Sequence, residues 1–486
     1  MLTVEEIKTF LDQDAASTKK QLARVGQRYY DGDHDIRNFR VFFIDGEGQL
    51  QEDTYRSNIK ICHPFFKILA DQEAQYILSV EDGIFKSDIP ELQSELDEYF
   101  NSNDEYMSEL YDAIVGAVVK GHDFMYAYKN AEGKTSFQCA DSLGVVEVES
   151  RFASDKREHV LFCYLDKVDS EGKRIRRIQD WDNKEVFFYV QKDDGKIEKD
   201  PDAKLNPRPH ITYTKPRDEH IYYDDYGTIP FVRLDNNKRQ QSGLMFIKDQ
   251  IDSYDLMNCG LANNIQDTSE ALYVVKGFQG DNLDELMLNI KAKKHIGVDE
   301  DGGVEIKTVD IPYEARKIKM EIDEKNIFRF GFGVNTESLK DTSATVSVAI
   351  KSAYANLDLK CNGFNKELRK FLRKQLDFVL EEINREKGTS YRQKDIYFNL
   401  ERQIITNAQE AAQIKLIEAQ EQQTRVATIL NTASMFGDEL TMQNLCEAFE
   451  MDYDDLKDKF PQPEEELTTL QSELDSIPVE EEKEGI

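Results

Sequence analysis

One short stretch near the N-terminus carries carboxylates at alternate positions, the spacing that calcium-binding loops use. It reads Asp31-Gly32-Asp33-His34-Asp35. A calcium loop also needs glycine at its sixth position and glutamate at its twelfth, and those positions hold Ile36 and Phe42. We therefore predict a polar turn at the end of a helix and no metal site. A metal-dependent hydrolase that acts through an acidic pair such as Asp31 and Asp33 is the weakest of the functional alternatives.

The other residues that do chemistry in enzymes are scattered along the chain. The seven histidines include no His-x-x-x-His zinc pattern. Neither a Gly-x-x-x-x-Gly-Lys-Ser/Thr phosphate loop nor a Gly-x-Ser-x-Gly elbow is present. The six cysteines form no Cys-x-x-Cys pair, which is typical of free thiols in a reducing compartment, and they stand at positions 62, 139, 163, 259, 361 and 446. The sequence therefore predicts a protein that is not an enzyme and uses no cofactor.

The composition bounds the architecture and the partners. The chain has 486 residues, with 94 acidic against 62 basic side chains and a formal net charge of −32. Hydrophobic residues make up 40%, which excludes wholesale disorder, and the length indicates two to four folding units. Such a charge argues against a protein that grips DNA, itself a dense line of negative charge. No apolar stretch approaches the length of a membrane helix, and the N-terminus lacks the pattern of a signal peptide, so we expect no membrane partner.

The first half of the sequence mixes helices and strands. A capping box at Thr3-x-x-Glu6 begins one helix, and Asn58 is a candidate cap for another. Apolar residues keep helical spacing over 89–100 and 104–120. Turn signals between β-rich segments then predict an antiparallel sheet region over 123–232.

The middle of the chain predicts two long helices separated by a compact module. The first follows the polar break at residue 235, with Ser242 as a candidate cap, and the second follows Pro312. Between them we expect a strand at 271–275, a helix at 284–294, and a hairpin of 295–298 with 304–309 around the turn at 301–303. The helix after Pro312 is rich in charge and has only a narrow apolar stripe, Ile318, Ile322, Ile327 and Phe328. Such a helix is completed by neighbours, either within the chain or in a ring of copies.

The last third is mostly helical. A Gly/Ser/Thr-rich segment after residue 331 predicts a mobile loop, and a helix without proline follows over about 344–387. We expect another helix over 402–435 and a short one after the cap Thr441. The acidic tail 461–486 is predicted to be disordered.

Several segments in order resemble one family. They include Tyr29–Ile36, Asn58–Phe65, Ile229-Pro230-Phe231, Ile251–Asp255 and Ala353–Lys360. The chain resembles the portal proteins of tailed bacteriophages, in the branch from long-tailed phages of Gram-positive bacteria, over about 400 residues. The stretch Thr342–Val348 departs from that pattern because it lacks the Ser-Gly pair expected before the long helix, and the tail beyond 460 does not match.

The resemblance implies an α+β, mainly helical portal fold that forms a ring. It would be a dodecamer at one capsid vertex with a channel for double-stranded DNA. The segments would be a wing (1–234), two stem helices (235–265 and 312–331), a clip between them (266–311), a tunnel loop (332–343), a long helix returning to the wing (344–399), a crown (400–460) and the tail (461–486).

The resemblance also implies roles for particular residues. The loop at the narrowest point of the channel would include Val334, Asn335, Thr336, Glu337, Ser338, Leu339, Lys340, Asp341 and Thr342. Basic residues that would face the channel are Lys317, Lys319 and Lys340, while Lys291, Lys293 and Lys294 would lie on the docking surface of the clip. For the basic cluster at 366–374, we favour pairing with carboxylates of the next subunit over contact with phosphates.

The partners that the resemblance implies are further copies of the chain, the terminase large subunit, a head-tail adaptor protein, and the major capsid and scaffolding proteins. The protein would reside in the virion, and in the host cytoplasm during assembly. The alternative is an acidic capsid-associated scaffold or adaptor without a DNA channel.

Overall fold

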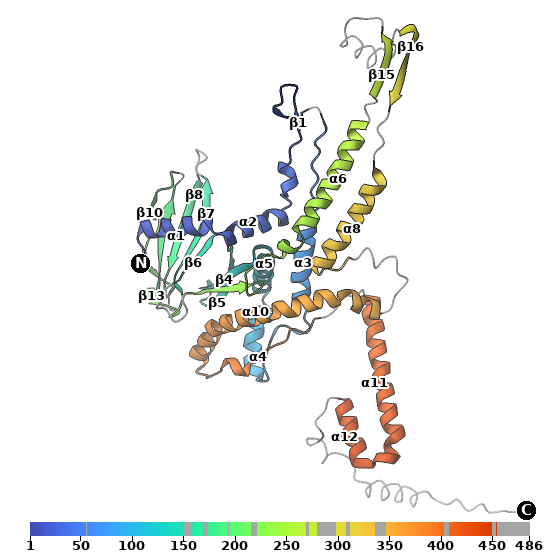
Figure 1. The fold of residues 1–486 in the computed structure, drawn as a ribbon. Coiled ribbons are helices and arrows are strands. Elements are labelled where there is room, and N and C mark those ends of the chain that lie inside the picture. The colour runs from blue at the N-terminus through green and yellow to red at the C-terminus, as the bar shows by residue number, and fades with distance from the viewer. Residues whose placement is uncertain are drawn as a thin grey trace, which may run out of the picture. The chain divides into compact units, whose positions relative to one another are not determined.

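The computed structural model describes most of the chain (Figure 1). The described residues are 1–54, 56–149, 157–168, 174–192, 194–214, 221–268, 272–278, 298–307, 312–335, 347–402, 408–449 and 453. The chain divides into two compact units. The first consists of Met1–Ala344 with Val348–Ile404, and the second of Thr345–Ser347 with Ile405–Ile486.

The chain opens with two helices, and the first of them is capped as the sequence predicts. In α1 (Val4–Ala16), the backbone N–H of Glu6 donates to Thr3 Oγ1 at 3.3 Å, and the N–H of Thr3 donates to the Glu6 carboxylate at 2.8 Å. Ser17 caps α2 (Thr18–Tyr30) by accepting the N–H of Lys20 at 3.2 Å, without the reciprocal bond of a capping box. The predicted polar turn follows, leading into a 3₁₀ turn, η1 (Asp35–Asn38), and then a hairpin of β1 (Phe42–Ile44) and β2 (Leu50–Glu52).

The prediction of a helix beginning at Asn58 is wrong. Helix α3 runs from Phe65 to Leu78, and the residues before it are extended. Pro64 disfavours helical backbone at the preceding residue. The segment 57–63 instead lies along helix α6 (Lys248–Thr268), and we call it the strap.

Four backbone hydrogen bonds bind the strap to one stripe of α6. Alternate strap residues donate their N–H groups to side chains spaced four apart on the helix, in antiparallel order. The pairs are Ser57 to Asp267 (3.0 Å), Ile59 to Asn263 (2.6 Å), Ile61 to Cys259 Sγ (3.2 Å) and His63 to Asp255 (3.0 Å). Four helical residues rise about 6 Å and two extended residues about 6.6 Å, so the two repeats stay in register over this length.

The main core lies between helices from distant parts of the sequence. Helices α3, α5 (Asp104–Lys120) and α10 (Ser347–Lys387) supply most of its buried side chains. Helix α4 (Pro90–Leu96) and a π-helical turn, η2 (Asp97–Asn101), cover one end, and β3 (Phe85–Lys86) pairs with β17 (Tyr397–Phe398) after the 3₁₀ turn η5 (Gln393–Asp395). The long helix is confirmed from Ser347 onwards, whereas 344–346 lies outside the described residues.

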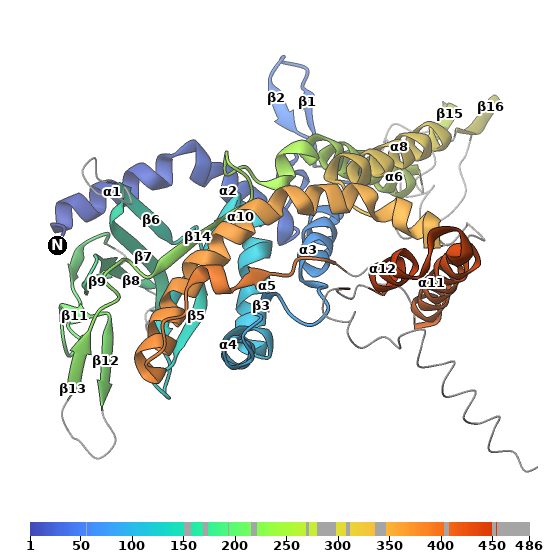
Figure 2. The ribbon, with the colours of Figure 1, turned by 90° about the horizontal axis from the view of Figure 1, so that it is seen from below.

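The sheet region predicted over 123–232 is confirmed, and its described strands are antiparallel. One sheet has the order β14 (Phe231–Asp235), β4 (His122–Lys129), β5 (Thr135–Ala140). Another has the order β10-β9-β8-β7-β6, with β11 also on β9, and Figure 2 shows it beside α1. Its strands are β6 (Val145–Glu149), β7 (Arg157–Val168), β8 (Arg174–Trp181), β9 (Glu185–Gln191), β10 (Ile197–Lys199) and β11 (Arg208–Pro209), and β12 (Ile211–Thr214) pairs separately with β13 (Ile221–Asp224).

The middle of the chain departs from the predictions in two places. Ser242 caps a 3₁₀ turn, η3 (Gly243–Phe246), and α6 begins only at Lys248. The expected turn at 301–303 lies within one continuous strand, β16 (Val298–Lys307), which pairs with β15 (Leu272–Phe278) and places Gly303 opposite Lys276. Two adjacent glycines in a sequence are typical of a turn. Only the pairing of this segment with β15 shows that it is a strand and not a turn. The helix expected at 284–294 lies outside the described residues.

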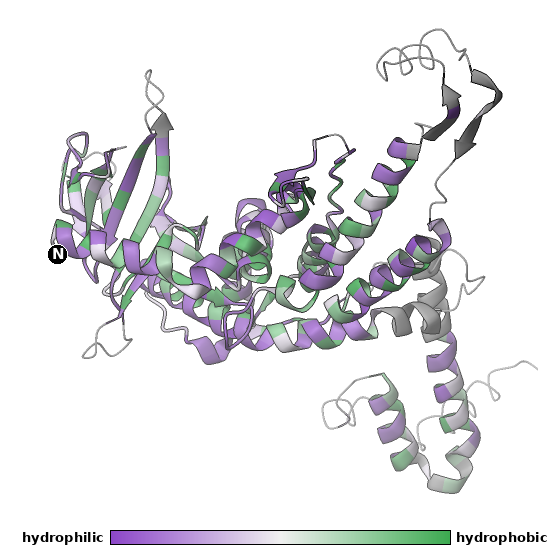
Figure 3. Cartoon of the chain, turned by 45° about the horizontal axis from the view of Figure 1, so that its top comes forward, coloured by the Kyte–Doolittle hydropathy of each residue, from purple (hydrophilic) through white to green (hydrophobic). Residues whose placement is uncertain are grey.

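The remaining helices follow the predicted order. Helix α8 runs from Tyr313 to Gly331, as expected after Pro312. In the second unit, α11 (Ala408–Phe436) packs on α12 (Asp438–Ala448), whose cap is Gly437, so the predicted cap Thr441 lies inside the helix. No described helix is long and apolar enough to cross a membrane, and Figure 3 shows hydrophilic residues along all the long helices. The tail 461–486 lies outside the described residues.

Removing one acceptor from the stripe on α6 should loosen the strap locally. In an Asn263→Leu variant, the Ile59 amide should exchange up to about tenfold faster, because it loses a hydrogen bond worth about 1 kcal/mol. Hydrogen exchange measured by NMR or mass spectrometry reports this. Asn263→Asp keeps an oxygen acceptor and should retain the protection. Equal exchange rates of the Ile59 amide in the parent and in the Leu variant would contradict the hydrogen bond between the strap and α6.

His122, on β4, should make the protein sensitive to mild acid. Burial, with a smaller contribution from Arg233, lowers the pKa of His122 to about 4. The unfolded chain binds a proton near pH 6.5 while the folded chain does not, so stability is lost as pH falls from 6.5 towards 4. His122→Gln should reduce that loss by up to about 3 kcal/mol.

Denaturant titrations at several pH values, followed by the fluorescence of the single tryptophan, Trp181, measure this effect. Trp181 lies in a core cluster with Phe124 and Phe231, and the ring of His122 lies 5.6 Å from that of Phe124. The stability difference between variant and parent should be constant above pH 7, where the imidazole is neutral in both states. A difference that is also constant between pH 6.5 and 4 would refute the pKa assignment.

Candidate functional site

The two segments predicted to form a stem contain helices α6 and α8, which pack along one another (Figure 1). Polar contacts join them. Ser253 on α6 donates to Asp323 on α8 at 2.8 Å, and Lys319 donates to Ser253 Oγ at 2.8 Å and forms an ion pair with Asp323. Gly260 makes room for Arg316, since a Cβ there would lie 2.1 Å from the guanidinium. The pair is therefore held partly by polar contacts specific to these two helices.

The structure separates the two lysines that the sequence analysis placed in the channel. Lys319 is about half exposed and is engaged by Asp323, which is only 4% exposed. A phosphate contact by Lys319 would compete with that ion pair. Lys317 is exposed and forms no ion pair with any residue in the described part of the chain. Lys340 and the clip lysines Lys291, Lys293 and Lys294 lie outside the described residues.

The start of the predicted tunnel loop is tightly bound to α3. Gln72 accepts the N–H of Val334 at 2.8 Å and donates to its carbonyl at 3.2 Å, and Asn335 donates to Glu324 at 3.1 Å. Gly333 lies directly against Leu69, since a Cβ there would come within 2.0 Å of the leucine side chain. The loop therefore starts from a fixed point. Thr336, Glu337, Ser338, Leu339, Lys340, Asp341 and Thr342 lie outside the described residues.

Lys360 joins three helices at the same point. From α10, its ammonium donates to the carbonyl of Gly331 at the end of α8 (3.1 Å) and pairs with Glu73 on α3 (2.8 Å), which is 1% exposed. Removing one partner from a buried ion pair is strongly destabilising, because the other charge is left without compensation. Lys360 therefore fixes the end of α8 relative to the body. The sequence showed Lys360 only as part of a family-like segment and did not indicate its partners.

Asp255, on α6, brings together the turn after α2, the strap and its own helix. Its Oδ2 lies 2.6 Å from His34 Nδ1 and its Oδ1 lies 2.7 Å from His63 Nδ1. The other ring nitrogen of His34 lies 3.2 Å from the carbonyl of Tyr29. The two ring nitrogens of His34 therefore face two oxygen atoms, one from the Asp255 carboxylate and one from the backbone. Burial alone would raise the pKa of Asp255, but the hydrogen bonds from the two histidines lower it.

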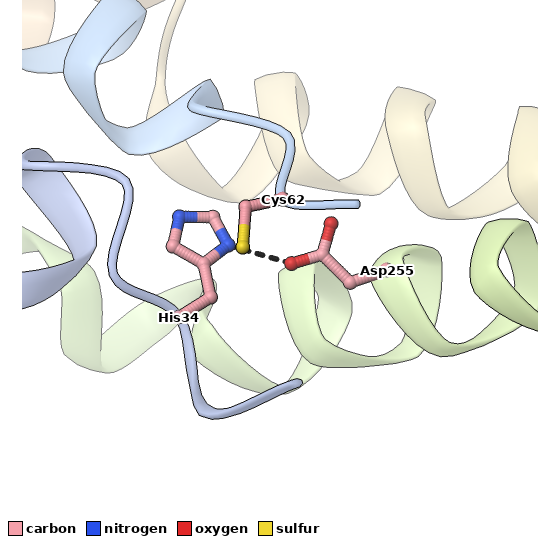
Figure 4. A group of neighbouring side chains, drawn as sticks. All are labelled: His34, Cys62 and Asp255. Atoms are coloured by element: carbon pink, nitrogen blue, oxygen red, sulfur yellow. Dashed lines mark hydrogen bonds and ion pairs between the residues drawn. The ribbon is translucent and has the colours of Figure 1, made fainter. Parts of the chain in front are cut away.

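Among the described residues, His34, Cys62 and Asp255 form the one group with the composition of a metal site (Figure 4). Their ligand atoms lie within 4.8 Å of one another. Both carboxylate oxygens already accept hydrogen bonds from imidazoles, and a metal ion would have to displace them. The group is thus satisfied by hydrogen bonds that join the turn after α2, the strap and α6. In the sequence, His34 stands out only as part of a calcium-like stretch, and no local pattern indicates its partner 221 residues away.

Comparison with known proteins agrees with the resemblance noted from the sequence. The family model "Phage portal protein, SPP1 Gp6-like" matches residues 11–447. The portal protein of Bacillus phage SPP1 is 25% identical over 425 residues, covering 85% of this chain and 82% of that protein. The portal protein of Clostridium phage phiCD119 is 25% identical over 402 residues, covering 78% and 82%.

A solved structure, "Neck of native GTA particle computed with C12 symmetry", aligns with 78% of this chain and 88% of that chain, at 11% identity and a TM-score of 0.40. The match of the family model to nearly the whole chain confirms the resemblance. The chain belongs to the SPP1 Gp6-like family of phage portal proteins, which are structural, non-enzymatic components of the phage.

Proposed function

We propose that this chain assembles as a dodecameric ring at one vertex of the capsid and forms the channel through which double-stranded DNA is packaged and ejected. The observation that carries the proposal is the helix pair α6–α8 together with the loop that is clamped at its base. The pair is long, charged and projects from the body of the first unit, and its loop begins at a point held by α3 and α10. A polar loop whose first residues are fixed to the body is suited to contact DNA as it moves through the channel.

The charge of the protein suits passage of DNA better than binding of DNA. Each phosphate contact made by a lysine or arginine strengthens nucleic-acid binding and slows sliding. The chain has a net charge of −32, and on α8 the ion pair with Asp323 already occupies Lys319. Of Lys317 and Lys319, only Lys317 is free to contact the phosphates of DNA in the channel. A ring of such chains would repel DNA from its walls and offer only sparse points of attraction.

We assign the parts of the portal as follows. Residues 1–234 form the wing with the return 344–399, the helices within 235–265 and 312–331 form the stem, and 266–311 forms the clip. The clip, with Lys291, Lys293 and Lys294, docks first the terminase large subunit and later the head-tail adaptor protein. The crown, 400–460, faces the major capsid and scaffolding proteins during assembly in the host cytoplasm. As a portal protein, the chain is a component of the virion.

The exposed basic cluster on α10 fits contacts between subunits. Its members Lys366, Arg369, Lys370, Arg373 and Lys374 are exposed, and Lys370 pairs with its neighbour Glu367 at 2.9 Å. With so many more carboxylates than cations in each chain, an adjacent copy offers partners for the others. We therefore assign this cluster to the ring contact instead of the channel.

The purified protein should form rings with an open channel. Negative-stain images viewed down the axis should show a central hole of about 20 Å or more, wide enough for duplex DNA. Native mass spectrometry gives the subunit number. Closed particles without a channel would favour the scaffold or adaptor alternative, and a strictly monomeric protein would exclude the portal function.

Shortening the loop should impair DNA handling and leave assembly intact. Deletion of residues 336–341 spares Val334 and Asn335, which Gln72 and Glu324 hold. Rings should therefore form normally, while the amount of DNA packaged or retained in a packaging assay falls several-fold. A six-residue deletion within 470–480 of the tail is the matched control. Full packaging by the loop variant would remove the tunnel-loop assignment.

A further inference from the structure

The β1–β2 hairpin exposes an apolar face that nothing in the described part of the chain covers. Phe42, Ile44 and Leu50 are 51%, 71% and 68% exposed. Phe42 and Ile44 lie two residues apart on one strand, and Leu50 lies directly opposite Ile44, so all three share one face. The hairpin pairs with no other described strand. An isolated two-stranded hairpin is at best marginally stable in water, so this one needs a covering surface.

The hairpin is nevertheless held in place, because the strap follows it directly. The strap binds α6 from Ser57 to His63, as described above. The strap therefore ties the hairpin to α6, along a different face of that helix from the one where Ser253 and Gly260 meet α8. The hairpin projects from the body beside the stem (Figure 1).

Helix α8 carries a second exposed apolar surface. Ile318 and Ile322, one turn apart, are 53% and 49% exposed. Asp323 and Ile327 are buried on the opposite side of the helix. The stripe of Ile318 and Ile322 thus points away from the chain's own core and away from α6. Continuing the same spacing towards the base of the stem, the stripe leads to Lys325 and Arg329, which are exposed and form no ion pair within the described residues.

The two surfaces have complementary chemistry. Each offers branched aliphatic side chains beside charged ones. The hairpin segment 40–53 contains one arginine and four carboxylates, a net charge of −3, whereas the α8 stripe continues into two cations. Glu314 and Glu321 flank that stripe, so the basic character is confined to its end near the base of the stem. Apolar residues with opposite charges at one end define both the contact and its direction.

We propose that the apolar hairpin face of one copy packs on the Ile318–Ile322 stripe of α8 in the next copy of the ring. The occupant is a second copy of this chain because portal proteins form oligomeric rings, and because the two surfaces have complementary chemistry and are both exposed in one chain. Such a contact is heterologous, and repeated contacts of this kind close into a ring. The hairpin then acts as an arm that joins adjacent stems. This inference rests on the ring that we propose above.

Three variants of the full-length chain test the arm. Ile44→Glu with Leu50→Glu places charge on the hairpin face, and Ile318→Glu with Ile322→Glu does so on the stripe. Phe43→Glu, on the other face of the hairpin, is the matched control. These side chains are exposed, so circular dichroism and thermal unfolding should match the parent. Each double variant should lower the fraction in rings by about tenfold or more in native mass spectrometry, while the control assembles as the parent does.

An equimolar mixture of the two double variants gives the sharpest result. Each copy retains one intact surface, so one contact forms per pair and no chain of contacts can grow. We expect heterodimers and no rings. Rings formed by either double variant alone would overturn the arm, as would double variants that lose assembly but give no heterodimer on mixing.

Two outcomes separate this inference from the proposed function. Failure of the unmodified chain to form rings refutes the function itself. In the other outcome, the parent and the hairpin variant both form rings, and the hairpin variant loses only its binding to a head-tail adaptor protein. That result would assign the hairpin face to the adaptor. It would overturn the arm but not the proposal that the chain forms a ring.

Discussion

The carboxylate of Asp255 joins three segments that are far apart in the sequence. It accepts from His34 in the turn after α2 and from both the ring and the backbone of His63 at the end of the strap. The side chain is completely buried, as is that of His34. A buried carboxylate has a large desolvation penalty, and only several well-placed donors offset it. The position of the stem helix on the body therefore depends on the strap being seated, and the strap in turn carries the hairpin.

A second buried carboxylate, that of Glu73, is compensated in a similar way at the end of α8. Lys360 and Glu73 form an ion pair that also reaches the last turn of α8, and Gln72 holds the next residues by their backbone. These contacts fix where the stem ends and where the loop begins. A conduit needs this division, because the part that meets a moving polymer has to adapt while its mount stays rigid.

On the surface of this protein, the excess of carboxylates bears on its partners and not on its stability. An excess of carboxylates argues against a DNA partner only if the partner must be held. For a portal, weak contact with DNA is an advantage, and we propose that the abundant carboxylates pair instead with cations of neighbouring copies. In that proposal, Lys325 and Arg329 on α8, the basic cluster on α10 and the acidic hairpin all take part in contacts between subunits.

Local patterns in the sequence were sufficient to predict many of the elements. The capping box of α1, the helices α5, α8 and α10, and the antiparallel strands between residues 122 and 235 follow from caps, periodicity and turn residues, which act over a few positions. The family followed from the order of several short segments. The sequence also predicted that a helix with so narrow an apolar stripe needs neighbours.

Only the tertiary structure decided the rest. Asn58 has the chemistry of a helix cap, but the segment that contains it is extended because α6 accepts its neighbours' backbone N–H groups. Glycines 302 and 303 have the composition of a turn, but both lie within strand β16, where Gly303 pairs with Lys276 of β15. Neither the Asp255 cluster nor the Lys360 anchor has a local signature, since their partners lie roughly 200 to 290 residues apart. Caps and periodicity are local, whereas burial of a charge depends on which distant donors the completed fold brings to it.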